Sequence, residues 1–289
     1  ALVVRSQDYR ASYQTLWDEV DRAARALIAK GVKVGDRVGI WSPNRSEWVV
    51  IQLATARIGA VLVNVNPAYK ASELRYALTQ SEVSLLCLAK GFRQTDYVAI
   101  LDQVKSDLPA LRESVVIDSG WDALLSAGDA VPASAVTDVE ATLSFDDPIN
   151  IQYTSGTTGA PKGATLSHHN IVNNAAFIGK TMRYSEADRV CIPVPFYHCF
   201  GMVIGNLACI AHGAAMIAPG EAFEARAVLE TVEAERCTSL YGVPTMFIAM
   251  LADETIAERD LSSLRTGVMA GSPCPVEVMK AVKARMNMT

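Results

Sequence analysis

The residues whose types and spacing best suit a chemical role lie in one short stretch, Tyr153 to Gly163. Its sequence is Tyr-Thr-Ser-Gly-Thr-Thr-Gly-Ala-Pro-Lys-Gly. Glycines let a backbone approach an anion closely, while hydroxyl and free N–H groups donate hydrogen bonds to phosphate oxygens. Lys162 adds a compact positive charge. The stretch also follows a predicted strand that ends at Tyr153. It therefore predicts a phosphate-binding loop.

Two other interpretations of this stretch are open from its residues. A cluster of serine, threonine and glycine is more often only a flexible turn, but the lysine, the proline and the third glycine favour phosphate binding. The Walker A pattern G-x-x-x-x-G-K-[ST] is not matched, because Gly163 and not a serine or threonine follows Lys162. An ordinary P-loop NTPase is therefore disfavoured. The helical pattern from Ser167 predicts a helix N-terminus whose positive dipole end lies near the loop.

A second candidate is His198, which lies among aromatic residues in the run Pro195 to Gly201. A histidine in such company is more often a core residue with one hydrogen bond. It would gain a chemical role if a carboxylate had to approach a phosphate, because an imidazole stabilises two anions by hydrogen bonding or by positive charge. The apolar segment Tyr241 to Phe247 fits the wall of an acyl tunnel and fits core packing equally well.

No metal ligands are predicted. His168, His169 and His212 lack the spacing of a zinc site, and the first two are interpreted as a solvated cap near a helix start. Asp146 and Asp147 precede a proline and are typical of a turn.

The composition is that of an ordinary globular protein, with 289 residues, half of them apolar, and a net charge of -5. Because there is no basic stripe, nucleic acid is excluded as a partner. Six cysteines without a C-x-x-C pair predict reduced thiols and a cytoplasmic location. The longest apolar run, Phe200 to Ala211, is well short of the roughly 20 residues of a transmembrane helix.

Apolar periodicity predicts alternating strands and helices, which is typical of an α/β fold with mostly parallel sheets covered by helices. The predicted strands are 37–41, 61–65, 83–88, 149–153, 189–192, 214–217, 238–241 and 266–269. The predicted helices are 13–28, 47–58, 72–78, 167–178, 202–210, 225–234 and 275–284. Residues 118–147 are rich in small and polar side chains and are predicted to be the loosest part, between a first sub-structure at about 1–120 and a second at about 148–289.

Thr154 to Gly163 resembles, at every defined position, the signature of the adenylate-forming (AMP-binding) superfamily, with Ala160 at the single free position. This superfamily includes acyl-CoA synthetases, luciferases and the adenylation domains of peptide synthetases. Further motifs of the family resemble Ser12-Tyr13 with Leu16, Gly59-Ala60 to Asn66-Pro67, Pro195 to Gly201, and Gly271-Ser272-Pro273. The likeness covers nearly the whole chain and is greatest to the medium-chain fatty acyl-CoA synthetases.

The resemblance implies a fold and a set of site residues. The fold would be the large N-terminal domain of the adenylate-forming enzymes, with αβαβα-type layers, apparently truncated. The implied catalytic residues are Thr154, Lys162 and His198, and the implied substrate-binding residues are His198, Tyr241, Gly242 and Val243. The implied nucleotide-binding residues are Thr154, Ser155, Gly156, Thr157, Thr158, Gly159, Lys162, Gly163, Gly271, Ser272 and Pro273.

The resemblance also implies an activity. A fatty acid would react with ATP and Mg²⁺ to give acyl-adenylate and pyrophosphate, and coenzyme A would then take the acyl group. The family's Tyr-Gly-x-Thr-Glu motif, ribose-binding aspartate, hinge and C-terminal domain are expected beyond Thr289, so the 289-residue chain alone is expected to be inactive. An acyl-AMP ligase, an aryl-CoA ligase and a non-catalytic nucleotide-binding fragment remain alternatives, and a homodimer is left open.

Overall fold

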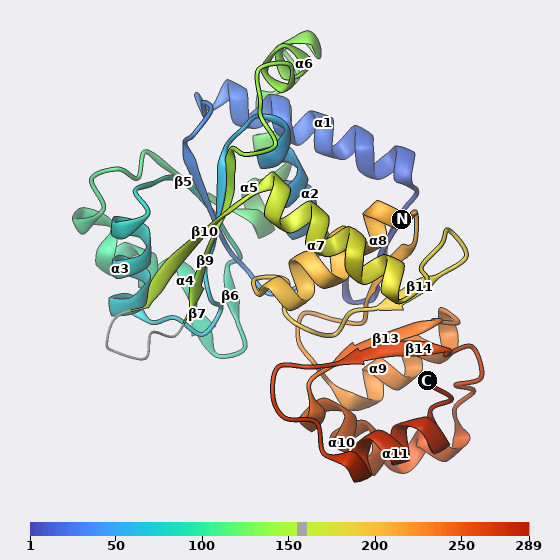
Figure 1. Ribbon diagram of the computed structural model, residues 1–289. Coiled ribbons are helices and arrows are strands. Elements are labelled where there is room, and N and C mark those ends of the chain that lie inside the picture. The colour runs from blue at the N-terminus through green and yellow to red at the C-terminus, as the bar shows by residue number, and fades with distance from the viewer. Residues whose placement is uncertain (155–160, 289) are drawn as a thin grey trace. The chain divides into compact units, whose positions relative to one another are not determined.

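The computed structural model describes residues 1–154 and 161–288 (Figure 1). The chain divides into two compact units, which are described separately. The histidine unit, which contains His198, consists of Ala1–Tyr13, Asn44–Ser46 and Val172–Thr289. The loop unit consists of Gln14–Pro43 and Glu47–Ile171. It contains the predicted phosphate-binding loop, residues 153–163, which we call the phosphate stretch.

The loop unit is built on a sheet whose strands are β3 Arg37–Trp41, β4 Val61–Asn64, β5 Val83–Leu88, β8 Glu113–Val116, β9 Pro148–Thr154 and β10 Lys162–Ser167. Their order is β10-β9-β4-β3-β5-β8, and neighbours are parallel except the pair β9 and β10. β3 and β5 are buried along most of their length, as expected for strands of a parallel sheet that is covered on both faces.

Helices and short strands complete the loop unit. They are α1 Tyr13–Ala29, α2 Ser46–Arg57, α3 Ala71–Gln80, β6 Gly91–Phe92, β7 Thr95–Asp96, α4 Tyr97–Val104, η2 Lys105–Asp107, α5 Ile117–Ala127 and α6 Ser134–Glu140. α1 buries an apolar stripe that includes Leu16, Val20 and Leu27, at the spacing of one helix face. In the core, the rings of Trp41 and Tyr97 stack with their centroids 3.9 Å apart.

The histidine unit has a second sheet, whose strands are β1 Leu2–Val4, β2 Tyr9–Ala11, β11 Arg189–Cys191, β12 Ala215–Ala218, β13 Ser239–Gly242 and β14 Thr266–Met269. Their order is β14-β13-β11-β12-β1-β2, and only β1 and β2 pair antiparallel. The carboxyl ends of β11, β13 and β14 therefore share one edge of the sheet. Ligands of open parallel sheets bind at such an edge.

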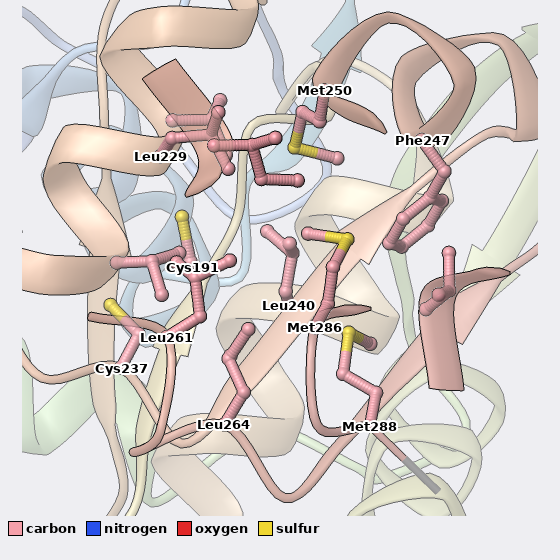
Figure 2. Packing of buried hydrophobic residues seen from close by; sticks show 14 of the residues in the cluster. Cys191, Leu229, Cys237, Leu240, Phe247, Met250, Leu261, Leu264, Met286 and Met288 are labelled. Carbon is pink, nitrogen blue, oxygen red and sulfur yellow. The ribbon is translucent and has the colours of Figure 1, made fainter. Parts of the chain in front are cut away.

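The helices of the histidine unit are η1 Arg5–Gln7, most of α7 His168–Thr181, a π-helix at Phe200–Leu207, α8 Ala208–His212, α9 Ala225–Ala234, α10 Pro244–Ala252, η4 Glu254–Glu258 and α11 Val276–Arg285. Figure 2 shows Leu240 of β13 packed with Leu229 of α9, Met250 of α10 and Met286 beyond α11 in one buried cluster. Four of the six cysteines are buried, and none is in a disulfide.

The α/β fold with mostly parallel sheets is confirmed, but two predictions about its parts were wrong. Residues 118–147 are not the loosest segment, because α5 and α6 occupy most of them. The unit boundaries differ from 1–120 and 148–289, because β1 pairs with β12 and β9 pairs with β4. The helix predicted at 202–210 is confirmed, and it consists of the π-helix followed directly by α8.

Candidate functional site

The two described ends of the phosphate stretch lie on neighbouring strands that pair with each other, because β9 ends at Thr154 and β10 begins at Lys162. Lys162 pairs with Thr154 and Gly163 pairs with Tyr153 across β9 and β10, and the Thr154 hydroxyl lies 3.4 Å from the Lys162 carbonyl oxygen. Thr154, Lys162 and Gly163 are exposed. The pairing therefore places a hydroxyl and an ammonium-bearing side chain on adjacent strands, open to solvent. The predicted residues Ser155, Gly156, Thr157, Thr158 and Gly159 lie outside the described residues.

Tyr153 anchors the strand that leads into this stretch. Its hydroxyl donates a hydrogen bond of 3.0 Å to the carbonyl of Ala77 in α3, and its ring meets that of Tyr76 edge-on. Burial raises the pKa of Tyr153, so the hydroxyl keeps its proton and remains a donor. The end of β9 is thus fixed to a helix one residue before Thr154.

The prediction that α7 brings its N-terminus near the loop was wrong for the described ends of the loop. β10 begins at Lys162, opposite Thr154, and ends at Ser167, which pairs with Pro148 at the far end of β9. Its six residues extend over about 17 Å at about 3.3 Å per residue. Because α7 begins only after this strand, its dipole acts at the opposite end of the hairpin from Thr154 and Lys162.

The neighbouring polar residues behave as turn and cap residues. Ser167 and Asn170 cap α7 reciprocally, and the Asp147 carboxylate accepts a hydrogen bond from the Ser144 N–H. His169 is exposed, and its Nδ1 atom lies 3.6 Å from Oδ1 of Asp146. The turn predicted at Asp146 and Asp147 is confirmed. In the described residues, no group of three or more His, Cys, Asp or Glu side chains is arranged to hold a metal ion.

His198 lies in a tight turn between β11 and the π-helix. Its N–H donates to the carbonyl of Pro195, and its own carbonyl accepts from the N–H groups of Gly201 and Met202. Its Nδ1 atom lies 3.1 Å from the backbone nitrogen of Phe200, whose N–H donates to it. An imidazole nitrogen that accepts a hydrogen bond carries no proton, so the proton of the neutral ring is on Nε2. His198 therefore presents an N–H donor at Nε2.

The protonation of His198 follows from its surroundings. The side chain is accessible to solvent, yet nearby protein atoms desolvate it enough to lower its pKa below the ordinary value of 6.5. The imidazole is therefore neutral at pH 7. The sequence left open whether it acts by charge or by hydrogen bonding, and the lowered pKa favours hydrogen bonding.

The π-helix is packed closely against the chain that precedes it. A Cβ atom at Gly201 would lie 2.3 Å from the carbonyl oxygen of Pro195, and one at Gly205 would lie 2.9 Å from the side chain of Ile192. Only glycine permits these approaches. π-helical turns are rare and are frequent at functional sites.

Tyr241 and Gly271 lie at the carboxyl ends of β13 and β14. The buried Tyr241 ring stacks on Phe200 with centroids 5.6 Å apart, and its hydroxyl donates to the carbonyl of Ile204 at 3.0 Å. Gly271 has φ of 88°, and a Cβ there would lie 3.0 Å from the Val243 side chain. The N–H of Ala270 donates to the carbonyl of Gly242.

The structure therefore divides the predicted site residues between the units. In the histidine unit it brings Tyr241, Gly242 and Val243 beside the loop of Gly271, Ser272 and Pro273, and it joins Tyr241 to the π-helix that follows His198. In the loop unit it brings together Thr154, Lys162 and Gly163. Tyr184, whose hydroxyl contacts that of Tyr241, was not predicted, because an isolated tyrosine after a helix carries no pattern.

None of the helices in the described residues is long and apolar enough to cross a membrane.

Comparison with known proteins matches the whole chain, residues 1–289, to the protein family described as AMP-binding enzyme. The mitochondrial medium-chain acyl-CoA ligase ACSF2 of Danio rerio is 42% identical, over 98% of this chain and 50% of ACSF2. The acyl-CoA ligase SID4 of Ajellomyces capsulatus is 43% identical, over 100% of this chain and 51% of SID4. The chain thus spans about half the length of the curated relatives it matches.

Among solved structures, the N-terminal domain of FACL13 from Mycobacterium tuberculosis matches with a TM-score of 0.87. The sequence identity is 25%, and the match covers 100% of this chain and 69% of the FACL13 domain.

Proposed function

Because the chain belongs to the AMP-binding enzyme family, we propose that it supplies the ATP-binding and acid-binding part of a fatty acid–CoA ligase. A carboxylate oxygen of the acid attacks the α-phosphorus of ATP, the bond to the bridging oxygen of the β-phosphate breaks, and pyrophosphate leaves. The thiol of coenzyme A then attacks the acyl carbon, releases its proton and expels AMP. Since the chain spans about half of its curated relatives, the proposed activity is that of a longer protein containing it.

The observation that carries the acid-binding part is the fixed imidazole of His198. The Phe200 N–H occupies Nδ1, which leaves the Nε2–H group as a donor. Because desolvation lowers the pKa of His198, its ring is neutral near pH 7, a pH at which a carboxylic acid is ionised. A hydrogen bond from Nε2 orients the carboxylate for attack without protonating the oxygen that must act as nucleophile.

We assign the phosphate groups of ATP to the phosphate stretch. The exposed Lys162 ammonium and Thr154 hydroxyl extend from adjacent strand ends, and such groups bind phosphate oxygens by charge and by hydrogen bonding. Ser155, Gly156, Thr157, Thr158 and Gly159 remain predicted members of this site. Gly271, Ser272 and Pro273 are assigned to the adenine side, where the positive φ of Gly271 lets the backbone turn sharply after β14.

Magnesium is proposed as a partner of the phosphates, whose negative charge it would neutralise. The described residues contain no cluster of three or more acidic, histidine or cysteine side chains for a metal. Mg²⁺ keeps several waters and commonly binds through substrate phosphates with one or two protein oxygens. The Thr154 hydroxyl would supply one such oxygen, whereas the Lys162 ammonium would bind the phosphates and not the metal.

The proposed acid is a medium-chain fatty acid. The ACSF2 relatives are named medium-chain acyl-CoA ligases, and the proposed acyl side, with Tyr241, Val243 and Phe200, is mainly apolar. An aryl-CoA ligase or an acyl-AMP ligase would share the ATP site and differ in its acid or its acceptor. A cytoplasmic location and a homodimer remain predictions.

The test is ATP–pyrophosphate exchange by the full-length protein that contains this chain, across aliphatic and aromatic acids of increasing size. We expect exchange to be greatest with medium-chain fatty acids, and coenzyme A to convert the adenylate to a thioester. If exchange is greatest with aromatic acids, the substrate is an aryl acid and not a fatty acid. A lack of exchange with every carboxylic acid would overturn the proposal.

Three substitutions at His198 test the role of its Nε2 atom. His198→Gln keeps a donor near the Nε2 position, whereas His198→Ala removes it and His198→Asn places an amide near Nδ1. Loss of one such hydrogen bond to a charged group corresponds to about a 10- to 100-fold reduction in kcat/KM for the acid. We expect His198→Gln to retain more activity than the other two. Equal loss in all three variants would contradict a role for the Nε2–H group.

A further inference from the structure

The π-helix Phe200–Leu207 determines how His198 is presented. Its first N–H group, that of Phe200, donates to Nδ1 of His198, and the His198 carbonyl accepts from Gly201 and Met202. Any shift of the first π-helical turn would therefore move the group that fixes the imidazole tautomer.

Three buried hydroxyl groups reach the π-helix in series. The Ser239 hydroxyl oxygen lies 2.7 Å from that of Tyr184, the Tyr184 hydroxyl lies 3.0 Å from that of Tyr241, and the Tyr241 hydroxyl lies 3.0 Å from the carbonyl oxygen of Ile204. Ser239 and Tyr241 are fully buried, and Tyr184 is 6% exposed. We call Ser239, Tyr184 and Tyr241 the hydroxyl relay.

The direction of the relay follows from its end. The Ile204 carbonyl only accepts, so the single proton of the Tyr241 hydroxyl points to it. Tyr241 must then accept from Tyr184, which leaves Tyr184 to accept from Ser239. Each member thus donates to the next, and Tyr184 is needed to satisfy both Ser239 and Tyr241.

Tyr184 is itself held by a charged cluster. Arg265, just before β14, donates to the carbonyls of Met182 and Arg183 and to the Asp188 carboxylate. Asp188 is 4% exposed and also accepts from the N–H and hydroxyl groups of Ser185. These contacts on both sides of Tyr184 fix the segment that presents its ring. The middle member of the relay is therefore held in place by these contacts.

The two tyrosine hydroxyls of the relay do not lose their protons near neutral pH. Burial, which is the largest influence on both tyrosines, raises the pKa of Tyr184 and that of Tyr241 well above the ordinary range. Both hydroxyls keep their protons at neutral pH. Their effect on the π-helix is therefore positional and does not depend on pH near neutrality.

We propose that Tyr184 is a positioning residue for the acid substrate, which acts through Tyr241 on the π-helix and so on His198 without contacting substrate itself. This inference rests on the proposed function. The Tyr184 hydroxyl holds the Tyr241 hydroxyl in the orientation that binds Ile204, and the Phe200 N–H at the start of the same helix holds the imidazole.

The test measures KM for octanoate, KM for ATP and kcat in the full-length protein with Tyr241→Phe, Tyr184→Phe and Ser239→Ala. Tyr241→Phe removes the direct bond to the helix, so we expect the largest rise in the octanoate KM, about three- to tenfold from one net hydrogen bond. Tyr184→Phe should give a smaller rise and Ser239→Ala the smallest. KM for ATP should change less than that for octanoate in all three.

The double variant Tyr184→Phe/Tyr241→Phe separates positioning from general loss of stability. If Tyr184 acts through Tyr241, its substitution adds nothing to the octanoate KM once the Tyr241 hydroxyl is gone. Simple destabilisation would lower the active fraction and kcat and leave the two KM values unchanged. Tyr97→Phe is the matched control, since it removes another buried hydroxyl, bonded to the Pro67 carbonyl in the loop unit. It should leave the octanoate KM unchanged.

The outcomes distinguish the two proposals. An octanoate KM that is unchanged in both Tyr241→Phe and Tyr184→Phe, in an enzyme that exchanges pyrophosphate normally, would overturn the inference and leave the proposed function standing. Additive effects in the double variant would also overturn it. A wild-type protein that activates no carboxylic acid would overturn both.

Discussion

The phosphate stretch and the π-helical segment are held by different kinds of contact. The ends of the phosphate stretch are set by backbone pairing of β9 with β10, and Thr154, Lys162 and Gly163 are exposed. The π-helix is instead held by buried side chains from other elements, among them Tyr241 of β13 and, through it, Tyr184.

This difference fits the ligands that we propose for each region. A phosphate group is highly charged and is bound by hydroxyls, N–H groups and lysine, which a local run of sequence supplies within ten residues. A carboxylate that must act as nucleophile needs one donor in a fixed position, and such a position is defined by surrounding packing. The first region should therefore be sensitive to the loss of charge and the second to the loss of support.

The largest effect is expected where charge is lost. Lys162→Ala should reduce ATP–pyrophosphate exchange about 100-fold, the usual cost of removing one preorganised group that stabilises charge in a transition state. The melting temperature should stay unchanged, because the Lys162 side chain is exposed. Lys180→Ala, an exposed lysine in the last turn of α7, is the control. Full exchange activity of Lys162→Ala at low ATP would remove the phosphate stretch from the mechanism.

The two regions also differed in how far sequence could describe them. β3 and β5 were predicted residue for residue, because buried parallel strands are mostly apolar runs between turn residues. β10 was missed, since Lys162–Ser167 is polar and exposed and is a strand only by virtue of its pairing with β9. The residue types of the phosphate stretch nevertheless predicted phosphate binding, although that strand was not predicted.

The acid side was predicted less completely. His198 was identified from its neighbours, but its tautomer depends on the Phe200 N–H, which only the fold places. A π-helix and an α-helix have similar apolar spacing over eight residues, so the pattern gave a helix without its type. Tyr184 is 55 residues from Ser239 and 57 from Tyr241, and no local pattern connects partners so far apart.

Acidification offers an intermediate test, because buried carboxylates support the histidine unit. Hydrogen bonding to Arg10, assisted by Arg189, lowers the pKa of Glu235. Burial alone would raise the pKa of Asp188, but bonds from Thr238, Ser185 and Arg265 outweigh burial and lower it. A carboxylate with a lowered folded pKa contributes stability that is complete above its unfolded pKa of about 4 and is lost as pH falls through the folded pKa.

We therefore expect the histidine unit to open before the loop unit below about pH 4. In the loop unit, hydrogen bonds lower the pKa of Glu73, but this carboxylate is exposed and so contributes less to stability than the buried pair of the histidine unit. Hydrogen exchange followed by mass spectrometry should show β11 and β13 losing protection at a higher pH than β3 and β5. Asp188→Asn should reduce this pH dependence. Loss of protection in the loop unit first would show that its support is the more acid-sensitive of the two.

The smallest effect is expected at Gly271, on the proposed adenine side of the histidine unit. Gly271→Ala places a Cβ on a residue with φ of 88° and 3.0 Å from the Val243 side chain. The left-handed backbone and the close contact together should cost about 1–2 kcal/mol of stability. Because the turn must shift to relieve them, KM for ATP should rise while KM for the acid changes less.

Gly220→Ala is the matched control for this substitution. Gly220 belongs to the same unit, and a Cβ there would meet its nearest neighbour, the Ala222 carbonyl oxygen, at an ordinary 3.6 Å. Gly220→Ala should therefore leave both the unfolding free energy and KM for ATP near the wild-type values. If Gly271→Ala lowers the unfolding free energy but leaves KM for ATP unchanged, the turn after β14 supports the fold and takes no part in ATP binding. The adenine side would then have to be sought at another strand end of the same sheet edge, since β11, β13 and β14 all present their carboxyl ends there.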